Sequence, residues 1–168
     1  MKLNVTYCSG NKVPGVHSPD TLYISNRISA FIEKCKIIDS KWAIFSALYG
    51  FFFPEEEKPN YDFTFRTDHS YWLGIAAVVN GRKLSREQSK AHIDRLSSEL
   101  RNQAKMQQLD QIVFFGPSPK MMKCYLAVLH YAFDYFQCSH GWAELIEHVK
   151  SQSKMIEVIH KLDSIAPS

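Results

Sequence analysis

The chain has 168 residues, 45% of them hydrophobic and 22% charged, and a net charge of +3 at pH 7. Values like these exclude a disordered or fibrous chain. The length fits one domain spanning residues 1–168, and the mild positive charge permits a nucleic-acid partner without arguing for one.

The first half of the chain predicts two strands with a helix between them. Leu3, Val5 and Tyr7 alternate with polar residues, as in a strand. The helix follows Ser25, because apolar residues then recur three and four positions apart. Residues 42–45 (Trp-Ala-Ile-Phe) form a short apolar run that is typical of a strand buried on both faces.

The second half predicts the same alternation. Ser85 and Gln88 resemble a capping box, and the helix that they open continues toward Met106. Residues 112–115 (Ile-Val-Phe-Phe) have the pattern of a buried strand. Ser118 then precedes a proline, which favours the start of another helix at that point.

The remaining segments are less regular. Residues 13–21 and 54–69 contain proline, and we expect irregular chain in the first and a long ordered loop in the second. Residues 71–79 fit either a helix or a strand. Residues 141–150 and 154–162 predict two terminal helices.

Strands that alternate with crossovers of helix length indicate a mostly parallel sheet. We therefore expect a single-domain α/β fold of three layers, with a mostly parallel central sheet between helices. The strands around Val5, Ile44 and Val113 are predicted to be neighbours in that sheet.

Several function classes lack support in the sequence. No window approaches the ~18 uninterrupted apolar residues of a membrane span, so we expect no membrane partner. No His or Cys residues recur at metal-ligand spacing, so we expect no metal site, and the sequence indicates no particular cofactor. Residues 1–4 lead straight into the first strand, so we expect no signal peptide and a reducing, cytoplasmic setting with free thiols. The cysteines are scattered: Cys8, Cys35, Cys124 and Cys138.

The carboxyl ends of the three predicted strands mark the place for a site, because ligands of open parallel sheets bind there. Residues 8–12, 46–54 and 116–120 follow those ends. The helix after Ser118 would offer free backbone N–H groups to an anion. The polar or permissive residues in the first two segments are Cys8, Ser9, Asn11, Lys12, Ser46, Tyr49 and Gly50.

Each of these residues also has a purely structural interpretation. Cys8 fits a small buried core residue, and Lys12 fits an exposed solvated lysine. Ser118 is explained by its position as a helix cap. What favours a site is that these signals converge on one edge of the sheet.

Four segments carry a resemblance to known proteins. Residues 8–12 (Cys-Ser-Gly-Asn-Lys), 22–25 (Leu-Tyr-Ile-Ser), 42–54 and 59–62 (Pro-Asn-Tyr-Asp) resemble a widespread family of uncharacterised proteins. Its members read C-S-x-x-K, L-Y-x-S, W-x-I-x-S-A-x-Y-G-x-x-x-P and a Y-D pair. The central segment is also similar to the S-G-L-Y-G-x-x-R-P segment of the peroxide-stress family YaaA, with Phe53 in place of the arginine.

A more distant resemblance is to the core domain of archaeosine synthase, which modifies a deazaguanine base in archaeal tRNA. Cys8 and Lys12 match its C-x-x-x-K pattern, although Val13 follows where the synthase has proline. These resemblances imply a fold like that of uracil-DNA glycosylases and recognition of a nucleobase.

Two functions of different classes remain open. The first is an enzyme acting on a nucleobase, nucleoside or nucleic acid, by base or tRNA modification or in a glycosylase-like way. In it Cys8 would add to an electrophilic carbon, Lys12 would assist, and Asp62 would be the general base. The substrate-binding residues of this hypothesis are Ser9, Asn11, Tyr23, Ser25, Ser46, Tyr49, Gly50 and Ser118.

The alternative is a non-catalytic nucleic-acid-binding or oxidative-stress-response protein. Its phosphate contacts would come from basic residues on and before the second predicted helix. Glu87, Asp94 and Glu99 lie among them, so they form no stripe of a single sign. These basic residues are Lys83, Arg86, Lys90, Arg95 and Arg101.

Overall fold

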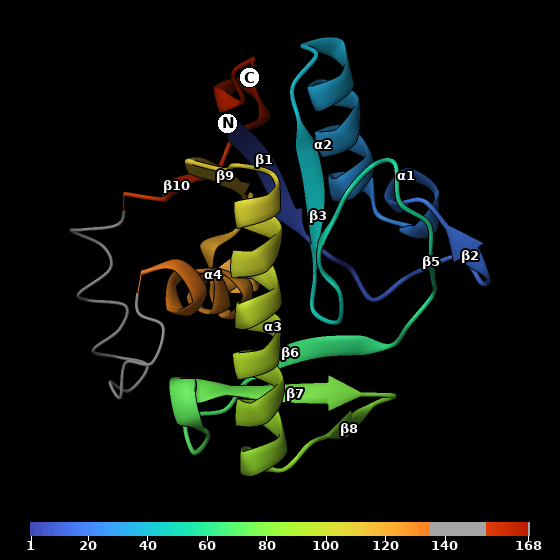
Figure 1. Ribbon diagram of the computed structural model, residues 1–168. Helices are drawn as coiled ribbons and strands as arrows, with labels where there is room; N and C mark the ends of the chain where they lie inside the picture. Colours follow the sequence, from blue (N-terminus) through green and yellow to red (C-terminus); the bar gives the residue numbers. More distant parts are fainter. Residues whose placement is uncertain (135–153, 168) are drawn as a thin grey trace.

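A five-stranded sheet forms the centre of the computed structural model, which describes residues 1–134 and 154–167 (Figure 1). The strand order is β10-β9-β1-β3-β4, and every neighbouring pair is parallel except β3 with β4. The predicted α/β class with a mostly parallel sheet is therefore confirmed. The strands are β1 (Lys2–Tyr7), β3 (Trp42–Ser46), β4 (Gly50–Phe52), β9 (Gln111–Phe115) and β10 (Ile156–Ile159).

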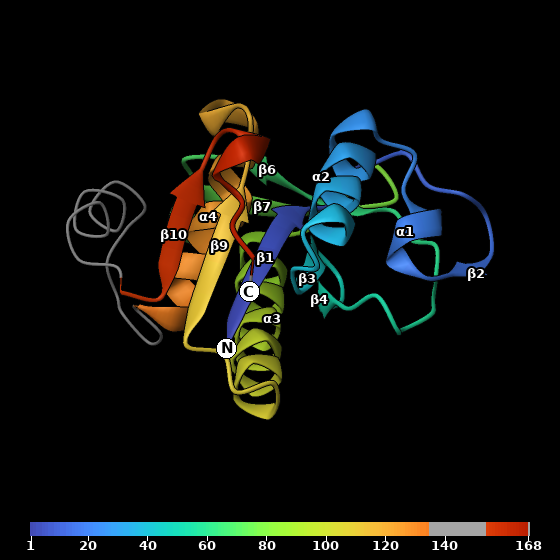
Figure 2. The ribbon, with the colours of Figure 1, turned by 90° about the horizontal axis from the view of Figure 1, so that it is seen from above.

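Helices cover both faces of this sheet (Figure 2). Successive residues of β9 point to opposite faces, and the ring of Phe115 stacks on Phe31 of α2 (Asn26–Ile37) with centroids 6.0 Å apart. On the other face, Phe114 contacts Tyr7, which stacks on Tyr125 of α4 (Pro119–Phe133) at 5.3 Å. The long helix α3 (Arg86–Met106) lies beside α4.

The strand predictions around Val5, Ile44 and Val113 are confirmed. β1 pairs in parallel with β3 on one side, Val5 opposite Ala43, and with β9 on the other, Val5 opposite Phe114. All the side chains of β3 are buried, as its apolar run predicts. The carboxyl ends of β1, β3 and β9 consequently meet at one edge of the sheet.

Two smaller sheets occupy segments that were expected to be irregular. Residues 54–69 are not one long loop, because they contain β5 (Lys58–Pro59) and β6 (Phe63–Thr67). Residues 13–21 contain β2 and most of α1, and residues 71–79 form a 3-10 turn followed by a strand. The additional elements are β2 (Val16–His17), α1 (Pro19–Leu22), η1 (Trp72–Gly74), β7 (Ile75–Val79) and β8 (Arg82–Lys83).

These small sheets form through long-range pairing. β6, β7 and β8 form an antiparallel sheet, and β5 pairs with β2, about forty residues earlier in the chain. A local pattern of polar residues and proline does not reveal such partners. The predicted irregular chain and long loop were wrong because these strands depend on tertiary contacts, which the sequence pattern does not show.

The predicted terminal helix over residues 154–162 is wrong. The segment forms β10 and then leads into η2 (Leu162–Ser164). Ile156 and Ile159 are buried against the edge of the sheet, where β10 pairs with β9. Pairing with the backbone of β9 stabilises this short segment as a strand more than its helical spacing of apolar residues stabilises it as a helix. The other predicted terminal helix, residues 141–150, lies outside the described residues.

Gln103 of α3 takes the place of a further strand beside β4. Its side-chain amide donates to the Phe51 carbonyl oxygen at 2.9 Å, and its Oε1 accepts from the Phe51 N–H at 2.8 Å. Gly50 has φ of 79°, and a Cβ atom there would stand 2.7 Å from this Oε1. Glycine is therefore required where the turn from β3 enters β4.

In the described part of the chain, none of the helices combines the length and the apolar character that crossing a lipid bilayer would require.

Candidate functional site

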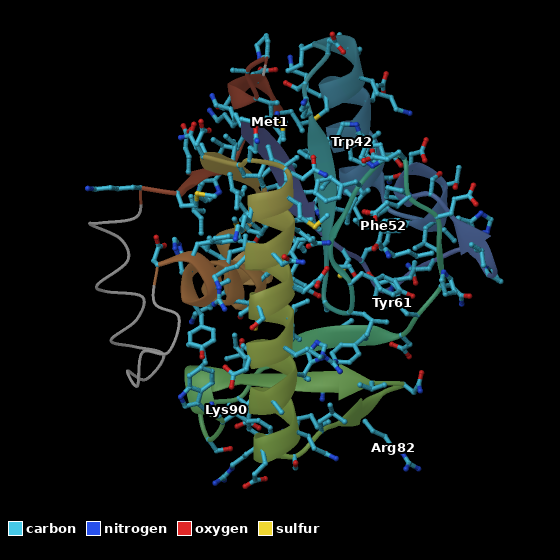
Figure 3. The ribbon with its side chains drawn as sticks, in the orientation of Figure 1. Met1, Trp42, Phe52, Tyr61, Arg82 and Lys90 are labelled. Atoms are coloured by element: carbon cyan, nitrogen blue, oxygen red, sulfur yellow. The ribbon has the colours of Figure 1, made fainter. Side chains whose placement is uncertain are left out.

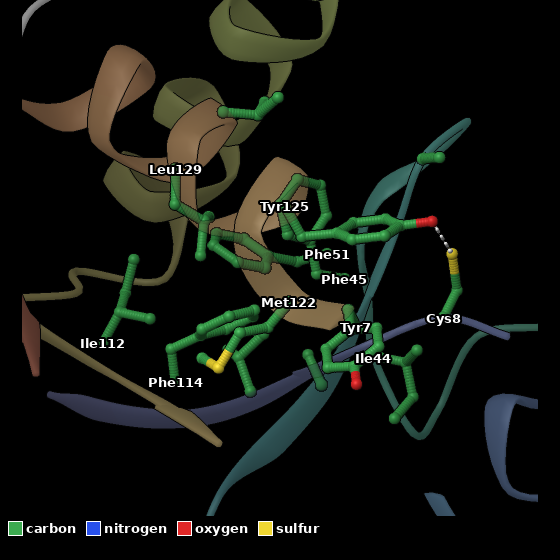
Figure 4. Close-up of a cluster of buried hydrophobic side chains, with 14 of the residues drawn as sticks. Tyr7, Cys8, Ile44, Phe45, Phe51, Ile112, Phe114, Met122, Tyr125 and Leu129 are labelled. Carbon is green, nitrogen blue, oxygen red and sulfur yellow. Dashed lines mark hydrogen bonds between the residues drawn. The ribbon is translucent and has the colours of Figure 1, made fainter. Parts of the chain in front are cut away.

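Cys8 stands directly after β1 at the edge where the three strand ends meet. Its backbone N–H donates to the Phe45 carbonyl oxygen of β3 at 2.9 Å, which fixes the residue between the two strands. The side chain is buried, with 3% exposure, and the thiol donates to the hydroxyl of Tyr125 at 3.5 Å (Figure 4). The sequence marked Cys8 but gave no sign of this partner on α4.

Lys12 lies in the loop that follows Cys8. Residues 11–13 run beside residues 22–24, since Val13 N–H donates to Leu22 and Ile24 N–H to the Asn11 carbonyl oxygen. The Lys12 Nζ is shielded from solvent and has no hydrogen-bond partner. Burial lowers the pKa of Lys12, while Cys8 and Asp62 act on it in the opposite direction.

Tyrosine rings form the surroundings of the Lys12 ammonium group. The Nζ lies 4.2 Å from the ring centroid of Tyr61 and 5.8 Å from that of Tyr23. The two tyrosine hydroxyls are 2.6 Å apart. Burial raises the pKa of both tyrosines well above the usual value, so both hydroxyls keep their protons at neutral pH.

The turn between β3 and β4 brings Ser46 and Tyr49 to the same place. Ser46 is buried, and its Oγ accepts from the backbone N–H groups of Leu48 and Tyr49 at 3.2 and 3.0 Å. The Tyr49 ring meets that of Tyr61 edge to face at 5.1 Å, beside the turn (Figure 3). Tyr61 thus packs against this turn. Hydrogen bonding by the Ser46 side chain acts against the effect of burial, which raises the pKa of Tyr23 and of Tyr61.

His92 of α3 anchors this turn from the other side. Its Nε2 lies 2.7 Å from the Ala47 carbonyl oxygen, and its Nδ1 lies 2.6 Å from Arg95 Nη2. Since a carbonyl oxygen and a guanidinium have fixed roles, His92 donates from Nε2 and accepts at Nδ1 as a neutral ring. Burial also lowers the pKa of His92, which agrees with that state.

Arg27 is a second buried cation beside Cys8. Its guanidinium stacks on the Tyr7 ring with its central carbon 3.6 Å from the centroid. It donates to the Thr6 Oγ1 at 2.7 Å and to the Cys8 carbonyl oxygen at 3.4 Å. Burial lowers the pKa of Arg27, and Tyr7, Cys8 and Tyr125 oppose that effect. Sequence reasoning missed Arg27, although it precedes buried Phe31 by one helical turn and so lies on the buried face of α2.

Other predicted site residues lie at the margin or have structural roles. Asn11 and Asp62 are exposed, and Asp62 acts on Lys12 only as a nearby charge. Ser9 donates to the Asn11 carbonyl oxygen within its own loop. Ser25 caps α2 by accepting from the Ile28 N–H.

Ser118 stands apart from this cluster. α4 begins after it, as predicted, but its side chain forms no cap hydrogen bond. The structure gives it no contact with the residues around Cys8. The residues that the structure brings together are Cys8, Lys12, Tyr23, Ser46, Tyr49 and Tyr61, with Gly50 in the adjoining turn, and to them it adds Arg27 and Tyr125.

Three of the five basic residues of the nucleic-acid-binding hypothesis contact neighbouring side chains. Lys83 forms an ion pair with Asp68, and Lys90 forms one with Asp94. Arg95 donates to His92. The two ion pairs reduce the positive charge that β8 and α3 would offer to a phosphate backbone.

Among the residues described, no group of three His, Cys, Asp or Glu side chains is placed to hold a metal ion. No family model, curated protein or solved structure matches the chain. The chemistry must therefore be inferred from the side chains themselves. These are the Cys8 thiol, the cations Lys12 and Arg27, and the tyrosine hydroxyls of the same cluster.

Proposed function

We propose that the protein is an enzyme acting on a nucleobase, a nucleoside or a base within a nucleic acid, with Cys8 as its nucleophile. The observation that carries this proposal is the buried, unpartnered ammonium of Lys12 close to Cys8. Buried polar groups in folded proteins almost always have partners, and an exception at a strand end beside a thiol favours a functional role over a structural one.

The chemistry that fits is addition of the thiol to a polarised double bond. Cys8 gives up its proton to water, and the sulfur forms a bond to the ring carbon beside the Lys12 ammonium. The π electrons of the attacked C=N or C=O bond move to its heteroatom, which then takes the proton from Lys12. A lowered pKa suits Lys12 to this donation, because it makes the ammonium a stronger acid.

The substrate class rests on two supports. The rings of Tyr23 and Tyr61 lie beside the ammonium and Tyr49 packs on Tyr61, and tyrosine faces and hydroxyls suit a planar heterocycle. The second support is the motif resemblance over residues 8–62, which implies recognition of a nucleobase and a fold like that of uracil-DNA glycosylases. Base or tRNA modification and glycosylase-like chemistry both belong to this proposal, as does a cytoplasmic setting that keeps Cys8 reduced.

The test is a thermal-shift and calorimetric screen against uracil, guanine, their nucleosides and short single-stranded RNA and DNA. We expect one of these classes to bind and to raise the melting temperature. Lys12→Met should then weaken binding by about tenfold, whereas Lys105→Met, an exposed lysine on α3, should leave it unchanged.

Two results would contradict the proposal. If no class binds at millimolar concentration, a nucleobase enzyme is excluded. If only oligonucleotides bind, and Lys12→Met and Cys8→Ser bind them as the unmodified protein does, the protein is a nucleic-acid-binding protein without catalysis at Cys8.

A further inference from the structure

We propose that Tyr125 is the positioning residue of Cys8: its hydroxyl holds the sulfur in place and donates a hydrogen bond to it whenever Cys8 is a thiolate. This proposal rests on the proposed function in one respect: the thiolate acts there as the nucleophile. It concerns a residue of α4 that lies 117 positions from Cys8 in the sequence.

The Tyr125 ring is fixed by aromatic neighbours from three different strands. It stacks on Tyr7 at 5.3 Å and meets Phe45 and Phe65 edge to face at 5.6 and 5.3 Å. The side chain is buried, with 7% exposure. Such a ring has no freedom to swing, so its hydroxyl stays aimed at the Cys8 sulfur (Figure 4).

The contact serves both states of the sulfur. As a thiol, Cys8 donates to the Tyr125 oxygen at 3.5 Å. After the thiol loses its proton, the sulfur becomes an acceptor, and rotation about the C–O bond turns the hydroxyl proton toward it. Burial, followed by the effect of Cys8, raises the pKa of Tyr125 well above its usual value, so the hydroxyl keeps its proton at neutral pH and can donate it.

Other groups act on the same sulfur, and the test must separate them. Asp62, which the sequence suggested as the base, is exposed and acts on Lys12. Two cations and two further tyrosines are also close enough for Cys8 to affect them. The titratable groups coupled to Cys8 are Lys12 from the loop after β1, Tyr23 after α1, Arg27 of α2, Tyr61 before β6 and Tyr125 of α4.

The experiment follows Cys8 ionisation without a substrate or a reagent. Carbon-13 at the β-carbon of cysteine reports thiol ionisation by NMR, and Cys8→Ser assigns the signal. We compare the unmodified chain with Tyr125→Phe, which keeps the ring and removes the hydroxyl. Tyr7→Phe is the matched control, because the Tyr7 ring lies in the same stack and its hydroxyl has no hydrogen bond to Cys8.

We expect Tyr125→Phe to raise the midpoint of the Cys8 titration by about one pH unit, a tenfold change in ionisation, since a charge-assisted hydrogen bond is lost. Tyr7→Phe should leave the midpoint within a few tenths of a unit. An unchanged midpoint in folded Tyr125→Phe overturns the proposal, and so does an equal shift in Tyr7→Phe.

A second variant covers the case in which Tyr125→Phe does not fold. Incorporating 3-fluorotyrosine at position 125 keeps the shape of the side chain and makes the hydroxyl a stronger donor. The Cys8 midpoint should then fall, and a rise would overturn the proposal. Because no nucleobase is used, a positive titration with a negative ligand screen leaves the role of Tyr125 standing and refutes only the proposed substrate.

Discussion

Lys12→Met should make the folded protein more stable while removing its activity. Methionine keeps a long apolar side chain but places no charge beside the rings of Tyr61 and Tyr23. In the unmodified protein the Nζ is buried without a hydrogen-bond partner. A residue retained for function rather than for the fold is expected to behave in this way.

The magnitude follows from two opposing contributions. A buried polar group without a partner destabilises a protein by ~1–3 kcal/mol. The interaction of the ammonium with the tyrosine rings returns ~0.5–1 kcal/mol of that. The net gain for Lys12→Met is therefore about 1 kcal/mol, which corresponds to a rise of ~2–4 °C in the melting temperature of a protein of this size.

The gain should also depend on pH, with a sign that the lowered pKa of Lys12 determines. Above its ordinary value of 10.5 the amine is neutral in the folded and the unfolded chain, so burial carries no charge penalty. As the pH falls from 10.5 through the lower folded-state pKa, the ammonium must be buried, and stability is lost. The advantage of Lys12→Met should therefore grow as the pH falls below 10.5 and shrink again toward pH 10.5.

The assay is thermal unfolding followed by circular dichroism between neutral pH and pH 10.5. Lys105→Met is the control, because this exposed lysine should change stability by no more than ~0.5 kcal/mol at any pH. A fall of several degrees in the melting temperature of Lys12→Met at neutral pH would refute the reasoning. It would mean that Lys12 supports the fold.

Two further predictions concern the fold around the site. Gln103→Leu should lower the free energy of unfolding by ~2 kcal/mol in a denaturant titration, because both Phe51 backbone groups lose their partner; an effect no larger than that of exposed Asn102→Leu would contradict this. Burial raises the pKa of Cys35 to about 12, so only about one thiol in a thousand is ionised at pH 9. Iodoacetamide should therefore modify Cys35 in urea but not in the native protein. Equal rates of modification in both would show that the thiol is accessible in the native state.

The central strands could be predicted from the sequence because they are buried on both faces. Short apolar runs such as residues 42–45 and 112–115 are typical of strands buried on both faces. The helices between such strands favour parallel pairing. The strand β10 was missed for the converse reason. Its four residues are strand only because the edge of β9 is free to pair with them.

The site could be predicted only in part. Cys8 and Ser46 follow neighbouring parallel strands, so topology alone brings them to one edge. Tyr125 is one of several apolar or aromatic residues on the buried face of α4, and nothing in that pattern separates a core aromatic from one whose hydroxyl meets a thiol. Asp62 shows the opposite error: its charge suggested a base, but the chain presents it to solvent.

The charges around Cys8 connect the stability prediction with the chemistry. Arg27 donates to two neutral oxygens, and Lys12 has no hydrogen-bond partner; among the residues that the structure describes, neither forms an ion pair with a carboxylate. Burial disfavours the charged form of each of these groups and lowers its pKa, and a negative charge that forms beside them offsets this cost. A thiolate on Cys8 is such a charge, and so is the negative charge that develops on an attacked heterocycle. The Tyr125 hydroxyl can donate a hydrogen bond to the thiolate. The free-energy cost of burying these charges is the reason why Lys12→Met should be more stable. The same cost falls when negative charge develops in the transition state, so the buried cations stabilise the transition state more than the ground state.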